Sequence, residues 1–91
     1  MKEVNKMTFI ILKDNKDSEF FLSINGLKSI SVKGETLYVS LGNEENLLIK
    51  GSHGKIKELY QEILKSIEDI YEASDLLLPT INISRFNCEF I

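Results

Sequence analysis

The chain has 91 residues, of which 43% are hydrophobic and 27% charged, and its formal net charge is −3. This composition is ordinary for a globular protein and excludes wholesale disorder; we expect a single domain over residues 1–91, too small for a large active site with a lid. The single cysteine, Cys88, excludes an intrachain disulfide framework and a metal site built from several cysteines, and it fits a reducing compartment.

The first apolar run covers residues 8–12 and is apolar on both parities. That pattern is typical of a strand in the middle of a sheet or one covered on both faces. The run is too short for the core of a secretory signal or for a membrane span, so we expect a cytoplasmic protein. A polar turn at 13–18 and a second strand over 19–24 follow.

Turn signals divide the next part of the chain into further strands. Asn25-Gly26 predicts a two-residue hairpin turn of type I′, because both residues tolerate positive φ. Gly34-Glu35 predicts another tight turn, with Gly in the first central position, and residues 42–44 predict a third. The strands that these turns separate span 27–33, 36–41 and 46–50. Together the patterns predict an antiparallel meander of four to six strands.

One face of the predicted sheet is apolar and the other is lined by hydroxyl side chains, which an antiparallel sheet tolerates because one face can stay hydrated. The members of the hydroxyl-rich face are Ser23, Ser29, Ser31, Thr36, Tyr38 and Ser40. It is either a solvated outer surface or a flat recognition surface with Tyr38 and Phe21 as aromatic anchors and Lys33 at its rim. No basic cluster accompanies these aromatics, which favours protein recognition over RNA.

A long helix is predicted from Ile56 to about Ala73, after a Gly-containing linker at 51–55. Apolar residues at steps of three and four form a stripe wide enough to pack on a sheet. The stripe consists of Ile56, Leu59, Tyr60, Ile63, Leu64, Ile67, Ile70 and Tyr71. These patterns indicate an α+β fold with one amphipathic helix on one face of the meander. The linker lacks the spacing of a phosphate-binding loop, so we interpret it as structural.

Acidic residues are concentrated in the second part of the chain. Residues 1–57 carry nine Lys against seven Asp or Glu, whereas residues 58–91 carry one Lys and one Arg against seven. The outer face of the predicted helix holds Glu58, Glu62, Glu68, Asp69 and Glu72, relieved by Lys65. This face is either solvated, or a patch that binds a basic partner or imitates nucleic-acid phosphates.

The C-terminal segment 76–91 leaves two alternatives open. The residues after Pro79 alternate as in a last strand that pairs with the N-terminal strand. Alternatively, the segment is a mobile apolar tail that docks on a second copy, which would give a homodimer. Cys88 is expected to be a small buried hydrophobic residue in either case.

No catalytic arrangement is recognisable in the sequence. Cys88 lies 35 positions from His53, the single histidine, and the carboxylates gather on an exposed face where acid–base chemistry is not favoured. We therefore expect a protein that is not an enzyme and has no cofactor or metal site.

Residues 20–59 resemble the front half of LytTR-type DNA-binding domains in their order of short strands, turns and helix. That family places a basic, His- and Arg-containing segment after its helix, where this chain has the acidic stretch 68–75 and Pro79. Because of this difference, we do not assign the chain to that family.

The composition, rich in Lys, Asn, Ile and Glu, is typical of an AT-rich bacterial genome or of a phage or mobile element. We therefore expect a small protein-binding domain, with inhibition of a host nucleic-acid-binding or defence protein as its specific form. Its partner-binding surface would be the acidic helix face or the open sheet face. The alternative is a nucleic-acid-binding or regulatory domain that uses Lys28, Lys33, Lys50, Lys55 and Lys57.

Overall fold

The computed structural model describes residues 8–42, 45–72 and 78–91. Within these residues the α+β class is confirmed, with seven strands, one long α-helix and one short 3₁₀-helix. In chain order they are β1 (Phe9–Lys13), β2 (Glu19–Ser23), β3 (Leu27–Lys33), β4 (Thr36–Leu41), β5 (Asn46–Lys50), α1 (His53–Glu72), β6 (Thr80–Asn82), η1 (Ile83–Phe86) and β7 (Glu89–Phe90).

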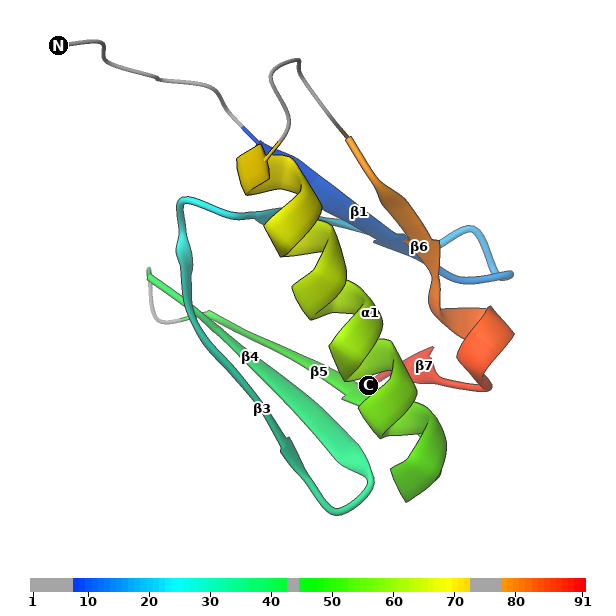
Figure 1. Ribbon diagram of the computed structural model, residues 1–91. Coiled ribbons are helices and arrows are strands. Elements are labelled where there is room, and N and C mark those ends of the chain that lie inside the picture. Colours follow the sequence, from blue (N-terminus) through cyan, green and yellow to red (C-terminus); the bar gives the residue numbers. More distant parts are fainter. Residues whose placement is uncertain (1–7, 43–44, 73–77) are drawn as a thin grey trace, which may run out of the picture.

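The strands form two sheets, and α1 crosses in front of both (Figure 1). The smaller sheet has the order β2-β1-β6, with β2 antiparallel and β6 parallel to β1. The larger sheet is antiparallel, with the order β3-β4-β5-β7. The central position predicted for the first strand is therefore confirmed, and the predicted meander is divided between two sheets.

The hairpin predicted at Asn25-Gly26 is wrong. Neither residue has positive φ, and β2 and β3, on either side of them, belong to different sheets. The Leu27 N–H donates to the Ile24 carbonyl at 3.3 Å, which bends the chain without reversing it into a hairpin. Sequence reasoning missed this because Asn-Gly permits several turn conformations, and tertiary packing selects among them.

The turn predicted at Gly34-Glu35 is confirmed. Gly34 has φ 61°, and Lys33 pairs with Thr36 across the two-residue loop. Positive φ at the first central residue of such a loop is the reason why Gly is favoured there. Of the third predicted turn, Asn43 and Glu44 lie outside the described residues.

Helix α1 begins three residues earlier than predicted, at His53. Ser52 is in the N-cap position, because its carbonyl accepts the Ile56 N–H at 2.8 Å. His53 Nδ1 lies 2.6 Å from the Gly34 carbonyl oxygen and donates to it, which attaches the start of α1 to the β3–β4 turn. The predicted end at Ala73 lies outside the described residues.

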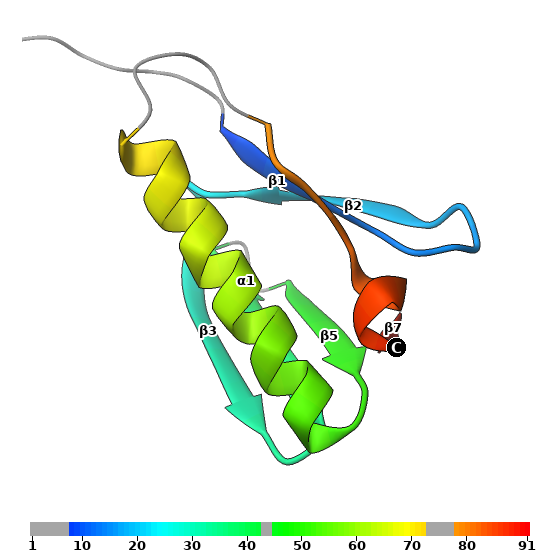
Figure 2. The same cartoon turned by 45° about the vertical axis from the view of Figure 1, so that its right-hand side comes forward.

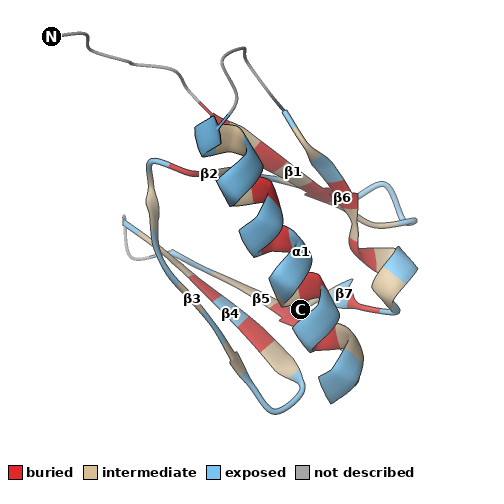
Figure 3. Ribbon diagram, in the orientation of Figure 1, coloured by how far each residue is buried: buried red, intermediate tan, exposed pale blue. Residues whose placement is uncertain are grey.

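The core lies between α1 and the inward faces of the two sheets (Figure 3). It is formed by Ile10, Leu12, Leu22, Ile24, Leu37, Val39, Ile49, Ile56, Leu59, Ile63, Ile81, Ile83 and Cys88. The predicted stripe was too wide at one side, since Leu64 is 38% and Tyr71 74% exposed. Ser66, three residues after Ile63 on the same side of the helix, is buried instead.

The C-terminal segment contributes to both sheets. As predicted, a strand after Pro79 pairs with the N-terminal strand, since β6 adds to β1. The 3₁₀-helix η1 then reverses the chain, with Asn87 left-handed at φ 55°, and β7 pairs with β5. Figure 2 shows this route from the β1–β2 hairpin down to β5. For the described residues 78–91, the mobile-tail alternative is contradicted.

Candidate protein-binding surfaces

The acidic residues predicted to bind a partner are all exposed on α1: Glu58, Glu62, Glu68, Asp69 and Glu72. Lys55 as well as Lys65 offsets the negative charge of these residues. Lys65 Nζ lies 3.6 Å from Asp69 Oδ2, and Lys55 Nζ lies 3.6 Å from Glu58 Oε1. Exposed pairs of this kind add little stability, but they reduce the negative charge of the face.

The helical repeat distributes these acidic residues over one broad arc of the surface of α1. At about 100° per residue, Glu58, Glu62 and Asp69 share one side of α1, which we name the acidic stripe. Glu72 and Glu68 follow at about 40° and 80° from Glu58, and Glu68 lies near Leu64 and Tyr71. The single acidic face expected from the sequence is therefore continuous but broad, and ion pairs with lysines reduce its charge in part.

Tyr38 and Lys33 lie on the outer face of the larger sheet, and the structure brings them together. Tyr38 is 39% exposed, and Lys33 Nζ lies 5.5 Å from the centroid of its ring, within cation–π range. Across the sheet, Tyr38 pairs with Ser31 of β3 and Leu48 of β5. The Ile91 N–H donates to the Leu48 carbonyl at 3.0 Å, which brings Ile91 beside the same strand.

We name this line of four residues, Ser31, Tyr38, Leu48 and Ile91, the Tyr38 row. Ile91 is 68% exposed and Leu48 half-buried, so the row has a largely apolar centre. A polar row adjoins it and consists of Lys33, Thr36, Lys50 and Glu89. Lys50 Nζ lies 3.7 Å from Glu89 Oε2. An apolar centre beside a polar rim is the anatomy of a protein–protein interface.

Phe21, predicted as a second anchor on the same surface, lies on the other sheet. It belongs to β2, is 53% exposed, and makes an edge-to-face contact with Phe9 at 6.1 Å between ring centroids. Ser23 lies on β2 as well. Both predictions failed for the same reason as the Asn25-Gly26 hairpin, because the chain changes sheets there.

Similarity to known proteins does not identify the function. No protein-family model, curated protein or solved structure matches this chain. Function is therefore inferred from the chemistry of the described surfaces.

The lysines of the nucleic-acid alternative do not form one patch. Lys28 and Lys33 lie on β3, Lys50 on β5, and Lys55 and Lys57 on α1. Of these, Lys50 and Lys55 are in the ion pairs with Glu89 and Glu58 described above. The positive charge is thus distributed over three elements and partly neutralised.

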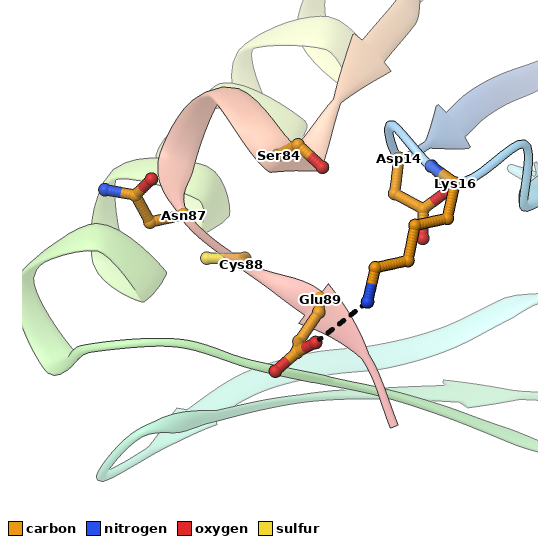
Figure 4. Close-up of a pocket in the computed structure, with 6 residues that line it drawn as sticks. All are labelled: Asp14, Lys16, Ser84, Asn87, Cys88 and Glu89. Atoms are coloured by element: carbon orange, nitrogen blue, oxygen red, sulfur yellow. Dashed lines mark hydrogen bonds and ion pairs between the residues drawn. The ribbon is translucent and has the colours of Figure 1, made fainter.

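Cys88 lines a hollow beside β7 (Figure 4), but its thiol is buried and engaged. Its Sγ donates to the Phe86 carbonyl at 3.3 Å. Burial raises the pKa of the Cys88 thiol by disfavouring the thiolate, and the charge of Lys55 opposes this in part. His53 bonds to Gly34 instead, and no hydrogen bond joins Cys88 to His53 within the described residues.

The described ranges lack two further kinds of feature. No group of three or more His, Cys, Asp or Glu side chains there could hold a metal ion. In the same residues, no helix is both long and apolar enough to cross a membrane.

Proposed function

We propose that this chain is a non-enzymatic protein-binding domain whose binding surface is the outer face of the β3-β4-β5-β7 sheet. The observation that supports this most is the Tyr38 row, an exposed line of aromatic and aliphatic side chains with a charged row beside it. Tyr38 is well suited to be an anchor, since aromatic residues near the centre of an interface contribute much of the binding energy.

More specifically, we propose that the protein is a cytoplasmic inhibitor encoded by a phage or mobile element. It would bind a host nucleic-acid-binding or defence protein and block its function. The composition supports this form of the proposal, being rich in Lys, Asn, Ile and Glu. In this form the acidic stripe of Glu58, Glu62 and Asp69 faces away from the contact or meets only its edge.

The proposal predicts that Tyr38→Ala weakens binding of the partner at least about tenfold, because the variant removes the aromatic anchor and the cation–π contact with Lys33. The partner is captured from a lysate of the host, purified, and its affinity measured by calorimetry. Phe21→Ala is the matched control, since Phe21 is 53% exposed but lies on β2 of the other sheet, and it should change the affinity less than about twofold.

A second variant tests the competing surface in the same assay. Glu62→Lys plus Asp69→Lys reverses the charge of the acidic stripe and should leave the affinity within about threefold of the parent. A loss of affinity in this variant alone would show that the partner binds to α1 and not to the sheet. Steeply salt-dependent binding to bulk DNA or RNA would favour the nucleic-acid alternative, and sedimentation at several concentrations would reveal a homodimer.

A further inference from the structure

Strand β3 forms one edge of the larger sheet. On the edge that points away from β4, it has no partner strand within the described residues. The two-residue turn makes Lys33 and Thr36 a hydrogen-bonded pair of the hairpin. Bonding alternates along an antiparallel ladder, so the N–H and C=O groups of Ile30 and Val32 are directed to the free edge. The edge is seven residues long, which is ample for one more strand.

A groove lies beside this edge, between β3 and α1. Its volume is about 390 Å³, and it is lined by Ile30, Ser31, Val32, His53, Lys57 and Tyr60. Helix α1 runs alongside β3 in both orientations (Figures 1 and 2). The hydrogen bond from His53 to Gly34 fixes the two walls at one end.

The same side of α1 extends the apolar wall beyond the groove. Leu64 follows Tyr60 by about one helical turn, and Tyr71 follows Leu64 by two. These two side chains are 38% and 74% exposed and line a second hollow together with Ile67. The apolar residues that were predicted to widen the core stripe thus form an exposed surface of α1 that continues from Tyr60, and α1 residues alone line its hollow.

The charge beside the edge is mostly positive. Lys57 lines the groove from α1, and Lys28 and Lys33 are exposed on β3, where Lys33 lies over the Tyr38 ring on the outer face of the sheet. Two acidic residues accompany them at the ends, Glu35 in the β3–β4 turn and Glu68 in the second hollow. An acidic ligand would therefore be attracted to the middle of the edge.

We propose that this groove binds an extended peptide segment of a partner protein, added as a further strand to β3, in which apolar residues alternate with Asp or Glu. The backbone groups of Ile30 and Val32 would supply main-chain hydrogen bonds. Alternate side chains of the peptide would enter the groove against Tyr60, while its carboxylates would lie near the lysines. The groove shares Ser31 with the Tyr38 row but is not lined by Tyr38, Leu48 or Ile91, so it extends the proposed function and does not depend on it.

The charges favour such a peptide over a second copy of this chain. In a pairing of β3 with another β3, each copy would bring Lys28, Lys33 and Lys57 to the shared edge. Lysine on an edge strand is one of the devices by which proteins discourage pairing of identical edges.

The test uses ¹⁵N-labelled protein and three capped eight-residue peptides. One alternates Val with Glu, the second alternates Val with Lys, and the third is the Val/Glu peptide with every backbone nitrogen methylated. We expect the Val/Glu peptide to bind with a Kd of about 1 mM or below and to slow amide exchange at Ile30 and Val32 at least about tenfold. The other two should bind at least about tenfold more weakly.

Matched variants locate the site. Lys57→Glu should weaken binding of the Val/Glu peptide at least about threefold, and Lys16→Glu, in the exposed β1–β2 turn and outside both the groove and the second hollow, less than about twofold. Thermal unfolding of each variant verifies its fold. Tyr38→Ala should leave peptide binding intact, which separates this site from the proposed sheet surface.

Three outcomes would overturn the proposal. The first is the absence of binding by the Val/Glu peptide, and the second is equal binding by either control peptide. The third is protection of Ile30 and Val32 that rises with protein concentration when no peptide is present, which would identify a second copy as the occupant.

Discussion

Replacing Ile63 by Asp should unfold the domain or lower its free energy of unfolding by about 4 kcal/mol or more. Ile63 is fully buried in the middle of α1, where it packs in the core between the helix and the sheets. The substitution removes a large aliphatic side chain and places a carboxylate where water cannot hydrate it. Such a loss is a large part of the free energy of unfolding of a typical domain, which is about 5–15 kcal/mol.

The neighbouring variant Leu64→Asp is the matched control for Ile63→Asp. Leu64 is one residue along the same helix but 38% exposed, so its carboxylate stays hydrated and the loss should be within about 1 kcal/mol. Both are measured by thermal and urea unfolding followed by circular dichroism. If Ile63→Asp kept a cooperative transition near that of the parent, the assignment of this helix face to the core would be wrong.

Gly51→Ala is expected to destabilise the domain by about 1–3 kcal/mol. Gly51 directly follows β5, and the segment after η1 approaches its backbone closely. A Cβ at Gly51 would lie 2.6 Å from Cys88 Sγ and 3.4 Å from the Asn87 carbonyl oxygen. Cys88 is 3% exposed, so its sulfur has little room to move. For a domain of this size, the melting temperature should fall by about 4–8 °C for each kcal/mol.

A second substitution identifies the cause of that loss. Cys88→Ala removes the sulfur, so Gly51→Ala combined with Cys88→Ala should be more stable than the sum of the two single effects by more than about 0.5 kcal/mol. Simple additivity of the two would show that the close approach between Gly51 and Cys88 does not limit packing.

Local patterns were sufficient to predict the individual elements. A short run that is apolar on both parities located β1, period-two alternation between turn signals located the strands from β2 to β5, and the three- and four-residue spacing located α1. Each pattern reports which side chains one element can bury. Gly34 was recognisable as a turn residue, since its position in a two-residue loop requires positive φ.

Apart from the pairing of β6 with β1, which was one of the two alternatives for the C-terminal segment, pairing between distant segments was not predictable from the same patterns. Alternation shows that a strand has an apolar face, but it does not say which strand lies beside it. The division into two sheets, the 3₁₀ turn between β6 and β7, and the position of Ile91 beside Leu48 all depend on such pairings. For this reason Tyr38 and Lys33 were identified, whereas Leu48 and Ile91 of the same surface were missed.

We propose above all that the outer face of the larger sheet binds a protein partner. The most direct measurement is an amide chemical-shift map of the ¹⁵N-labelled domain with and without its purified partner. We predict that the largest changes occur at Tyr38, Leu48 and Ile91. Changes confined to the acidic stripe of α1, with these three signals unmoved, would contradict the claim.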